Sequence, residues 1–370
     1  MSTPVNESPF QQTPMSSTPL PAVVIAIDAM GGDYAPEAIV EGGVLAAKEL
    51  QVGIQLVGPT ERVIQELKKH TIEGLPIVVV EAPDTIEMDE SPLQALKKKK
   101  HASIAVTARL VKEGVAQGMV AAGSTGVAMA AALFGIGRIE GVERPAIGVV
   151  MPNWTSPLVM IDGGANADCR PELLVQFAHM GQAYMKGVYK LQAPKIGLLN
   201  IGTEEGKGNA FVKEAYDVLQ HQTDLNFIGN VEGRHLFLGG CDVAVTDGFS
   251  GNVAIKAAEG MATLMMRRLK RELTASFWNK LVAVLVKPIL KKALKPVDHE
   301  EVGGSLLLGV KGICVIAHGS SSARAIVNAV RVAKQGIEGR VVEQLTQQLA
   351  EAKADTHVSQ ASSSSSLPRF

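Results

Sequence analysis

The stretch Val23-Val-Ile-Ala-Ile-Asp-Ala-Met-Gly-Gly-Asp33 joins a continuous apolar run to a pair of glycines and an acidic residue. A run without alternation of apolar and polar residues is typical of a strand that is buried on both faces of a sheet. The glycines predict a tight turn, and an amphipathic helical stretch is predicted from about residue 36. Strand, glycine turn and helix together form the repeating unit of an α/β sheet.

Further apolar runs repeat this unit along the chain. Because each one precedes a turn and a helical stretch, they predict a largely parallel sheet with helices on both faces. The expected fold class is α/β, a doubly wound three-layer α/β/α sandwich in a single catalytic domain of residues 22–340. The predicted strands are residues 23–28, 54–58, 77–81, 119–122, 146–151, 157–162, 195–201, 243–246 and 313–317.

Bulk composition narrows the class of protein. The chain has 370 residues and 46% hydrophobic residues, enough for a buried core, and its net charge of −1 gives no general attraction to nucleic acid. Cys169, Cys241 and Cys314 are far apart and lack metal-ligand spacing, which favours a reduced cytoplasm with no disulfide and no metal site. No apolar stretch approaches the roughly 18 residues that span a bilayer. We expect a cytoplasmic protein that touches a membrane without crossing it.

Both ends of the chain differ in composition from the body. Residues 1–21 are rich in Ser, Thr and Pro and lack the basic start and apolar segment of a secretory signal, so a disordered tail is predicted. Residues 341–370 begin rich in Gln, Ala and Glu and then contain a run of serines. They predict a helix followed by a second disordered tail.

Loops of small residues follow six of the predicted strands. In a doubly wound sheet the carboxyl ends of the strands form the crevice that binds ligands, and backbone amides of Gly and Ser there suit a phosphate or an oxyanion. A tight turn alone also requires glycine, but six such loops predict one shared crevice. Its candidate substrate-binding residues are Asp28, Gly31, Gly32, Ser124, Thr125, Gly126, Asp162, Asn166, Asn200, Gly202, Gly208, Asp247, Gly248, Ser250, Gly251 and His318.

The patterns of nucleotide sites and of enzyme nucleophiles are absent from these loops. Gly202 to Lys207 is one residue short of a P-loop, and Gly208 replaces the Ser or Thr that would hold magnesium. No G-x-G-x-x-G follows the first strand, and neither Ser124 nor Ser250 lies in a G-x-S-x-G elbow. We therefore expect no cofactor, and phosphate itself as the nucleophile.

Six motifs occur in order along the chain, at residues 25–43, 121–147, 162–181, 196–209, 227–234 with 242–260, and 317–326. Together they resemble the phosphate acyltransferase family of bacterial phospholipid synthesis (PlsX), from about residue 23 to about 334. The resemblance implies transfer of a long-chain fatty acyl group from acyl-acyl carrier protein to inorganic phosphate, which gives acyl phosphate for a membrane-bound glycerol-3-phosphate acyltransferase. It also implies a homodimer with a fold similar to isocitrate and isopropylmalate dehydrogenases and phosphotransacetylase. Gly163 departs from the family's usual Asp-Val-Gly.

Two side chains are the candidate catalytic groups. Lys207, in a glycine-rich loop, is placed to neutralise phosphate or to stabilise the oxyanion of the thioester, although a single lysine is often only a solvated surface charge. Asn252 is placed to donate its amide to the same oxyanion, and the alternative is a turn or N-cap residue.

Three other polar residues have expected supporting roles. A carboxylate repels an anion, so Asp162 is expected to orient Asn or Lys side chains. His318 is read as structural or as a general acid, and Asp33 as a helix cap.

Two basic segments suggest partners. Lys97, Lys98, Lys99 and Lys100 form a run that is either a solvated helix face or a docking surface for acidic carrier protein. Residues 263–296 combine many basic residues with one acid, Glu272, and with apolar runs. This pattern predicts an amphipathic helical hairpin, which binds an anionic membrane surface on the inner face, a dimer partner, or both. Its candidate contact residues are Trp278, Leu281, Leu285, Lys287, Lys291 and Lys295.

Two other functions stay open at this point. A dehydrogenase on the same fold would need residues for a hydride cofactor and a metal, and the sequence lacks their motifs. A non-catalytic membrane adaptor for lipid-synthesis enzymes would need only the basic hairpin.

Overall fold

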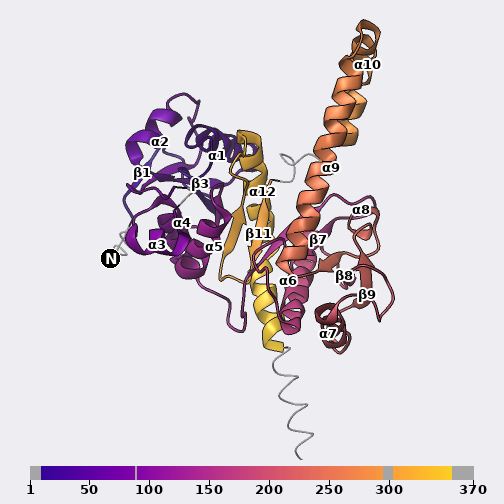
Figure 1. Ribbon diagram of the computed structural model, residues 1–370. Coiled ribbons are helices and arrows are strands. Elements are labelled where there is room, and N and C mark those ends of the chain that lie inside the picture. The colour runs from indigo at the N-terminus through magenta and orange to yellow at the C-terminus, as the bar shows by residue number, and fades with distance from the viewer. Residues whose placement is uncertain (1–9, 88–89, 295–302, 352–370) are drawn as a thin grey trace, which may run out of the picture. The chain divides into compact units, whose positions relative to one another are not determined.

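The computed structural model describes residues 10–87, 90–294 and 303–351. The chain divides into two compact units, of which unit 1 is Met1–Gly137 with Gly303–Ile337, and unit 2 is Arg138–Val302 with Glu338–Phe370 (Figure 1). The sequence pattern predicted one domain over residues 22–340, whereas the chain leaves unit 1 after Gly137 and returns to it at Gly303. Since both units repeat the same strand and helix pattern, composition does not mark this division.

Unit 1 contains a mostly parallel sheet. Strands β2 to β5 and β12 run parallel, while β1 pairs antiparallel with β4 and β11 antiparallel with β12. The strand order is β1 (Gln12–Pro14), β4 (Ile77–Glu81), β3 (Gly53–Gly58), β2 (Val24–Asp28), β5 (Gly118–Ala121), β12 (Ile313–Ile316) and β11 (Ser305–Leu308).

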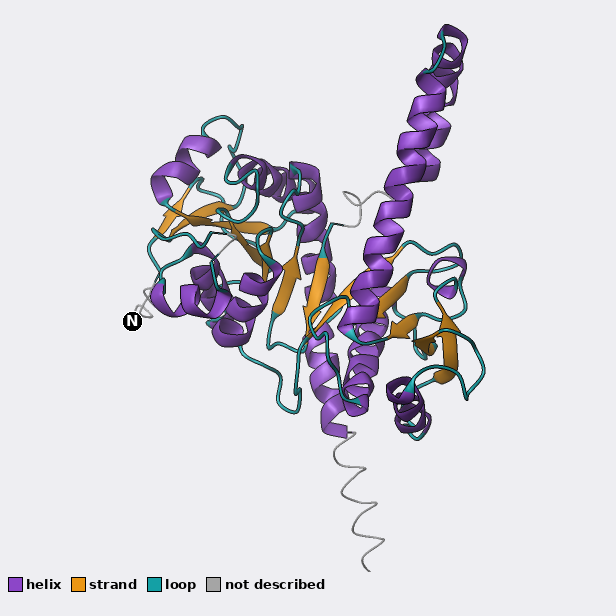
Figure 2. Cartoon of the chain, in the orientation of Figure 1, coloured by secondary structure: helices purple, strands orange, loops and turns teal. Residues whose placement is uncertain are grey.

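Helices cover both faces of this sheet (Figure 2). On one face, Gly43 of α1 packs against Ile54 and Leu56, and Gly42 lies against Ile326 of α12. On the other face, Ser103 of α4 hydrogen-bonds the carboxyl of Asp28. The helices of unit 1 are α1 (Glu37–Leu50), α2 (Thr60–Leu67), α3 (Pro92–Lys98), α4 (Ser103–Lys112), α5 (Thr125–Ala131), the π-helical turn η1 (Ala132–Ile136) and α12 (Ala323–Glu338).

Unit 2 has its own three layers. Its strands, in order, are β6 (Ala146–Met151), β7 (Leu158–Ile161), β10 (Val243–Val245), β8 (Ile196–Asn200) and β9 (Phe227–Glu232), and only the β6–β7 pair is antiparallel. Gly181 of α6 (Pro171–Tyr189) packs on Val243 from one face. On the other face, α8 (His235–Leu238) and the start of α9 (Gly248–Thr274) close a core around Ala244. Helix α7 (Ala210–Gln220) connects β8 to β9.

The predicted hairpin of residues 263–296 is the far end of a longer structure. Helix α9 runs without a break from Gly248 to Thr274, and α10 (Phe277–Leu294) packs back along it (Figure 1). Trp278, Leu281 and Leu285 are 72%, 51% and 73% exposed. Lys287 is exposed as well, Lys291 belongs to α10, and Lys295 lies outside the described residues. Within the described part of the chain, no helix is long and apolar enough to cross a membrane.

The predicted strands are all present, each within one residue at either end, and the α/β fold class is confirmed. Strands β1, β9 and β11 were not predicted. The prediction of a disordered tail over residues 1–21 is wrong for Gln12–Pro14, which pair with β4, and residues 1–9 lie outside the description. Such a short, polar strand has no apolar period and is held by backbone hydrogen bonds. Residues 341–351 are helical as predicted, and the predicted tail after them falls outside the described residues.

The two glycines Gly251 and Gly260 of α9 provide a stability test. A Cβ at Gly251 would stand 2.0 Å from the backbone oxygen of Asp162, whereas one at Gly260 meets nothing within 4 Å. We expect Gly251→Ala to lower the free energy of unfolding by about 1–3 kcal/mol or more through overpacking. Gly260→Ala is expected to raise it by about 0.5–1 kcal/mol through helix propensity. Denaturant titration measures both, and equal shifts in the two variants would contradict the packing argument.

Candidate functional site

Three strand-end loops of unit 1 meet through their backbones. Gly32 has a φ of 107°, and a Cβ there would stand 2.6 Å from the carbonyl oxygen of Ala122, in the loop after β5. The amide of Asp33 donates to the carbonyl of Gly319, in the loop after β12, over 2.8 Å. The loops after β2, β5 and β12 are therefore brought together as predicted, and only glycine fits at Gly32.

Asp28 lies at the base of this group of loops. Its carboxyl is buried, accepts from the amide of Met30 over 3.2 Å, and lines a small cavity of about 70 Å³ with Gly31, Ser103 and Ser124. Burial raises the pKa of Asp28 to about 6, against the lowering effect of the hydrogen bonds from Ser103 and Met30. Ser103 had no sequence signal as a site residue, because it begins a helix that is distant in sequence.

The other predicted residues of unit 1 flank these loops. Thr125 and Gly126 form the first turn of α5, directly after Ser124. His318 is exposed, and its Nδ1 lies 2.8 Å from Oγ of Ser320 and accepts from the Ser320 amide over 3.2 Å. Since this nitrogen accepts a hydrogen bond, the proton of the neutral ring is on Nε2. The imidazole thus has a local structural partner that sequence spacing did not reveal.

The expectation that Asp33 caps α1 is wrong. The N-cap residue is Pro36, and no side chain caps this helix. Instead, the carbonyls of Tyr34 and Pro36 accept from the amides of Ala38 and Val40. The backbone of Asp33 is held by Gly319, and its side chain is exposed.

The run Lys97 to Lys100 does not form one helix face. Helix α3 ends at Lys98, and Lys99 turns back to donate to Glu90 over 2.5 Å and to the carbonyl of Thr85 over 2.8 Å. The hydrogen bond from Lys99 lowers the pKa of Glu90. Lys97, Lys98 and Lys100 are exposed, so the basic surface open to a partner is smaller than the sequence suggested.

In unit 2, the loop after β7 is organised by one carboxylate. Asp162 is fully buried, and its Oδ1 accepts from the amides of Ile147, Gly164 and Ala165 over 3.0, 3.1 and 3.0 Å. Its Oδ2 accepts from the backbone and side-chain amides of Asn166 over 2.7 and 2.9 Å. Asn166 also donates to the carbonyl of Pro145. Asp162 therefore orients an asparagine, and both side chains are occupied in building the loop.

The start of α9 packs directly on this loop. Asp247 caps the helix by accepting from the amide of Ser250 over 2.8 Å, and the amide of Gly248 donates to the carbonyl of Asn166 over 2.8 Å. Gly248 and Gly251 allow the close approach, since a Cβ at either would overlap the loop backbone. Asn252 is consequently not the cap: it is an exposed residue one turn into the helix, beside Gly164.

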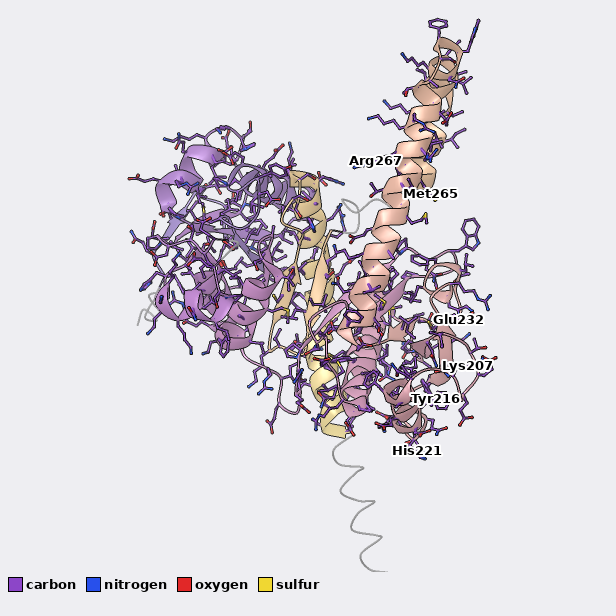
Figure 3. The ribbon with its side chains drawn as sticks, in the orientation of Figure 1. Lys207, Tyr216, His221, Glu232, Met265 and Arg267 are labelled. Atoms are coloured by element: carbon purple, nitrogen blue, oxygen red, sulfur yellow. The ribbon has the colours of Figure 1, made fainter. Side chains whose placement is uncertain are left out.

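Lys207 lies in the loop after β8, next to the end of that strand (Figure 3). The side chain of Asn200 fixes the loop, because its amide donates to the carbonyl of Lys207 over 3.1 Å and its oxygen accepts from the amide of Ile201 over 2.7 Å. Gly208 has a φ of 92°, and Gly202 is buried. Over the described residues, the exposed ammonium of Lys207 has no hydrogen-bond or salt-bridge partner, so it is available to an anion.

The thiols of the chain are poor nucleophiles. Cys169 lies 3.4 Å from the carbonyl oxygen of Asn166, and burial raises its pKa to about 11. Burial likewise raises the pKa of Cys241 and of Cys314 to about 12. All three thiols are protonated at neutral pH, and the thiolate is the reactive form. In the part of the chain that the structure describes, no group of three or more His, Cys, Asp or Glu residues forms a potential metal site.

The predicted residues thus gather in two groups. The first group, in unit 1, surrounds Asp28, and the second, in unit 2, contains Lys207 and Asn252 at the ends of neighbouring parallel strands. The single shared crevice stays a prediction. An anion beside Lys207 would meet an ammonium that is unpaired among the described residues, and a carbonyl oxygen beside Asn252 would meet an amide donor, the groups that stabilise developing negative charge.

Solved structures of related fold agree with this sheet arrangement. A phosphotransacetylase from Streptococcus pyogenes superposes with a TM-score of 0.58 at 18% identity, over 87% of this chain and 94% of that one. A putative 4-hydroxythreonine-4-phosphate dehydrogenase from Salmonella typhimurium gives a TM-score of 0.52 at 13% identity, over 85% and 98%. These likenesses establish the fold class.

Sequence relatives are much nearer. The family model described as fatty acid synthesis protein matches residues 23–344. The chain is 49% identical over 321 residues to the phosphate acyltransferase of Pelotomaculum thermopropionicum, covering 87% of this chain and 93% of the relative. It is 50% identical over 316 residues to that of Heliobacterium modesticaldum, covering 85% and 94%. The chain therefore belongs to the phosphate acyltransferase family.

Proposed function

We propose that this acyltransferase moves a long-chain fatty acyl group from acyl-acyl carrier protein to inorganic phosphate and releases acyl phosphate for phospholipid synthesis. The observation that carries the proposal is the ammonium of Lys207, unpaired among the described residues, in the loop after β8, which is the parallel neighbour of the strand that leads to Asn252. The relatives' activity, acyl transfer to phosphate, requires such a combination of a cation for phosphate and a donor for the thioester oxygen.

The reaction is a direct displacement. A phosphate oxygen, held by Lys207 and loop amides, attacks the carbonyl carbon of the thioester and forms the new C–O bond. Asn252 donates to the oxyanion of the tetrahedral intermediate. The C–S bond then breaks, the carrier thiolate leaves and takes up a proton, and acyl phosphate remains. A thiolate is a good leaving group near neutral pH, so neither a strong general acid nor a cofactor is needed.

Further partners complete the proposal. Acyl-loaded carrier protein supplies the substrate, and the exposed Lys97, Lys98 and Lys100 are a candidate surface for this acidic protein. A membrane-bound glycerol-3-phosphate acyltransferase takes the product. The α9–α10 hairpin, with its exposed apolar and basic residues, binds the inner membrane surface, a second copy of the chain in a homodimer, or both (Figure 3 labels Met265 and Arg267 on it).

The direct test mixes purified protein, palmitoyl-acyl carrier protein and phosphate, and measures acyl phosphate. We expect Lys207→Ala and Asn252→Ala each to lower kcat/KM by about 10²–10³, the cost of removing one donor to an oxyanion. Lys195→Ala is the matched control, because Lys195 is an exposed lysine directly before β8, at the opposite end of the same strand.

Each outcome of this assay has a distinct meaning. Absence of acyl phosphate formation by the wild-type protein would contradict the proposed function. Full activity in both Lys207→Ala and Asn252→Ala would agree with the proposed function but contradict the assignment of these two residues as catalytic groups. Lys195→Ala is expected to retain wild-type activity.

Asp28 makes stability depend on pH. Its pKa rises from 3.8 to about 6 on folding, so the folded state holds a proton that the unfolded chain has lost. The stabilising contribution is complete below pH 3.8 and disappears as pH rises through about 6, a loss of roughly 3 kcal/mol. We expect Asp28→Asn to remove this dependence. The difference in unfolding free energy between wild type and variant is measured across this range, and parallel curves would refute the prediction.

Charge reversal tests the hairpin. Lys287→Glu, Lys291→Glu and Lys295→Glu together are expected to weaken binding to vesicles containing anionic lipid by at least ~3 kcal/mol, roughly a hundredfold, because each basic residue near the surface contributes about 1 kcal/mol. Vesicle co-sedimentation measures this, with neutral vesicles as the control. Unchanged binding would leave dimerisation as the better explanation of the apolar hairpin.

A further inference from the structure

Large apolar side chains are exposed beside both proposed catalytic groups of unit 2. Ile201 is 81% exposed and follows β8, while Phe249 and Val253 are 67% and 53% exposed in the first turns of α9, after β10. Apolar residues that are exposed singly are common on protein surfaces. These three are notable because each belongs to a segment that also carries Lys207 or Asn252.

Ile201 is linked to Lys207 by one side chain. The oxygen of Asn200 accepts from the amide of Ile201, and the amide of Asn200 donates to the carbonyl of Lys207. Gly202 is buried, and the loop between Ile201 and Lys207 contains no other large apolar residue. The apolar side chain and the cation are therefore held in one small, fixed loop.

Phe249 and Val253 are linked to Asn252 by helix geometry. Residues three or four apart lie on the same side of a helix, so Phe249 is a neighbour of both Asn252 and Val253. The other side of the same turns is already occupied, since Gly251 lies against Asp162 and Ala254 and Ile255 pack on the core of unit 2. The exposed side of α9 thus combines the amide with two apolar side chains.

The register of the sheet places these two segments at the same end. Strands β10 and β8 are parallel neighbours in which Val245 pairs with Leu198. Ile201 comes three residues after Leu198, and Phe249 comes four after Val245. Both apolar groups therefore lie at the carboxyl ends of adjacent strands, where Lys207 and Asn252 also lie.

We infer that Ile201, Phe249 and Val253 form the binding surface for the hydrocarbon chain of the acyl donor and set its chain-length preference. The inference rests on the proposed function, because a thioester carbonyl between Lys207 and Asn252 brings the first methylenes of its chain to this end of the sheet. Each methylene moved from water to an apolar surface favours binding about fourfold. Discrimination between long and short chains follows from these side chains.

The test compares octanoyl-, dodecanoyl- and hexadecanoyl-acyl carrier protein as donors for wild type and for Ile201→Ser, Phe249→Ser and Val253→Ser. We expect the hexadecanoyl-to-octanoyl ratio of kcat/KM to fall about tenfold in Phe249→Ser, and to be largely restored in Phe249→Leu. Trp154→Ser is the matched control. Trp154 is 87% exposed and follows β6, which runs antiparallel to β7, so it lies at the other end of the sheet and its loss leaves the ratio unchanged.

Binding of dodecyl phosphate, measured by calorimetry, separates this inference from the proposed function. Wild type is expected to bind dodecyl phosphate about tenfold more tightly than Phe249→Ser does. If this difference is found but wild type makes no acyl phosphate, the inferred hydrocarbon-binding surface is supported and the proposed function is contradicted. The inference is overturned if all three variants keep the wild-type hexadecanoyl-to-octanoyl ratio of kcat/KM and the wild-type affinity for dodecyl phosphate. A loss of activity that is equal for every donor and accompanied by dissociation of a dimer also overturns it, because these side chains then contact a second copy.

Discussion

The carboxylate of Asp162, buried at the end of β7, determines the geometry of unit 2. A buried carboxylate without hydrogen bonds is very costly, and here four backbone amides and one side-chain amide satisfy it, with no cation paired to it in the part of the chain that the structure describes. Those amides belong to β6 and to the loop of residues 163–166. The carboxylate can be satisfied only if the loop turns back on the strand, so this interaction fixes the loop's conformation.

The loop in turn fixes α9. Gly248 and Gly251 bring the first turn of the helix into backbone contact with Asn166 and Asp162, and Asp247 satisfies the free amides at the helix start. Contact of this kind leaves the helix no freedom to rotate about its axis. The side on which Asn252 and Phe249 are exposed is therefore decided by two glycines and a carboxylate that need not touch substrate.

Much of this arrangement was readable in the sequence. Continuous apolar runs identified the central strands because burial on both faces leaves no other pattern, and the small-residue loops after them were correctly placed at strand ends. Strand β9 was not predicted because Gly229 and Asn230 interrupt its apolar run, and its pairing with β8 contains an irregularity there. Strand β11 is four residues long and follows two glycines. Its strand character depends on pairing with β12, which is not visible locally.

The sequence predicted that the candidate residues follow strands, but it did not predict which partners their side chains contact. Lys207 in a glycine loop after a strand is a pattern that sequence spacing reveals. By contrast, the role of Asp162 depends on the amide of Ile147, which belongs to the neighbouring strand, and the partner of Asp28 is Ser103, which begins a distant helix. Tertiary hydrogen bonds of this kind have no local signal.

One continuous helix joins the proposed site to the hairpin. From its cap at Asp247 to Thr274, α9 spans 27 residues, or about 40 Å, and its exposed side changes from the amide of Asn252 to the methionines and arginines near the tip. The first turn is anchored by the loop of Asp162, so one unbroken helix connects that loop to the hairpin. A lipid surface or a second copy bound to the hairpin as proposed would therefore lie at the far end of the helix that carries Asn252, within the same unit of the chain.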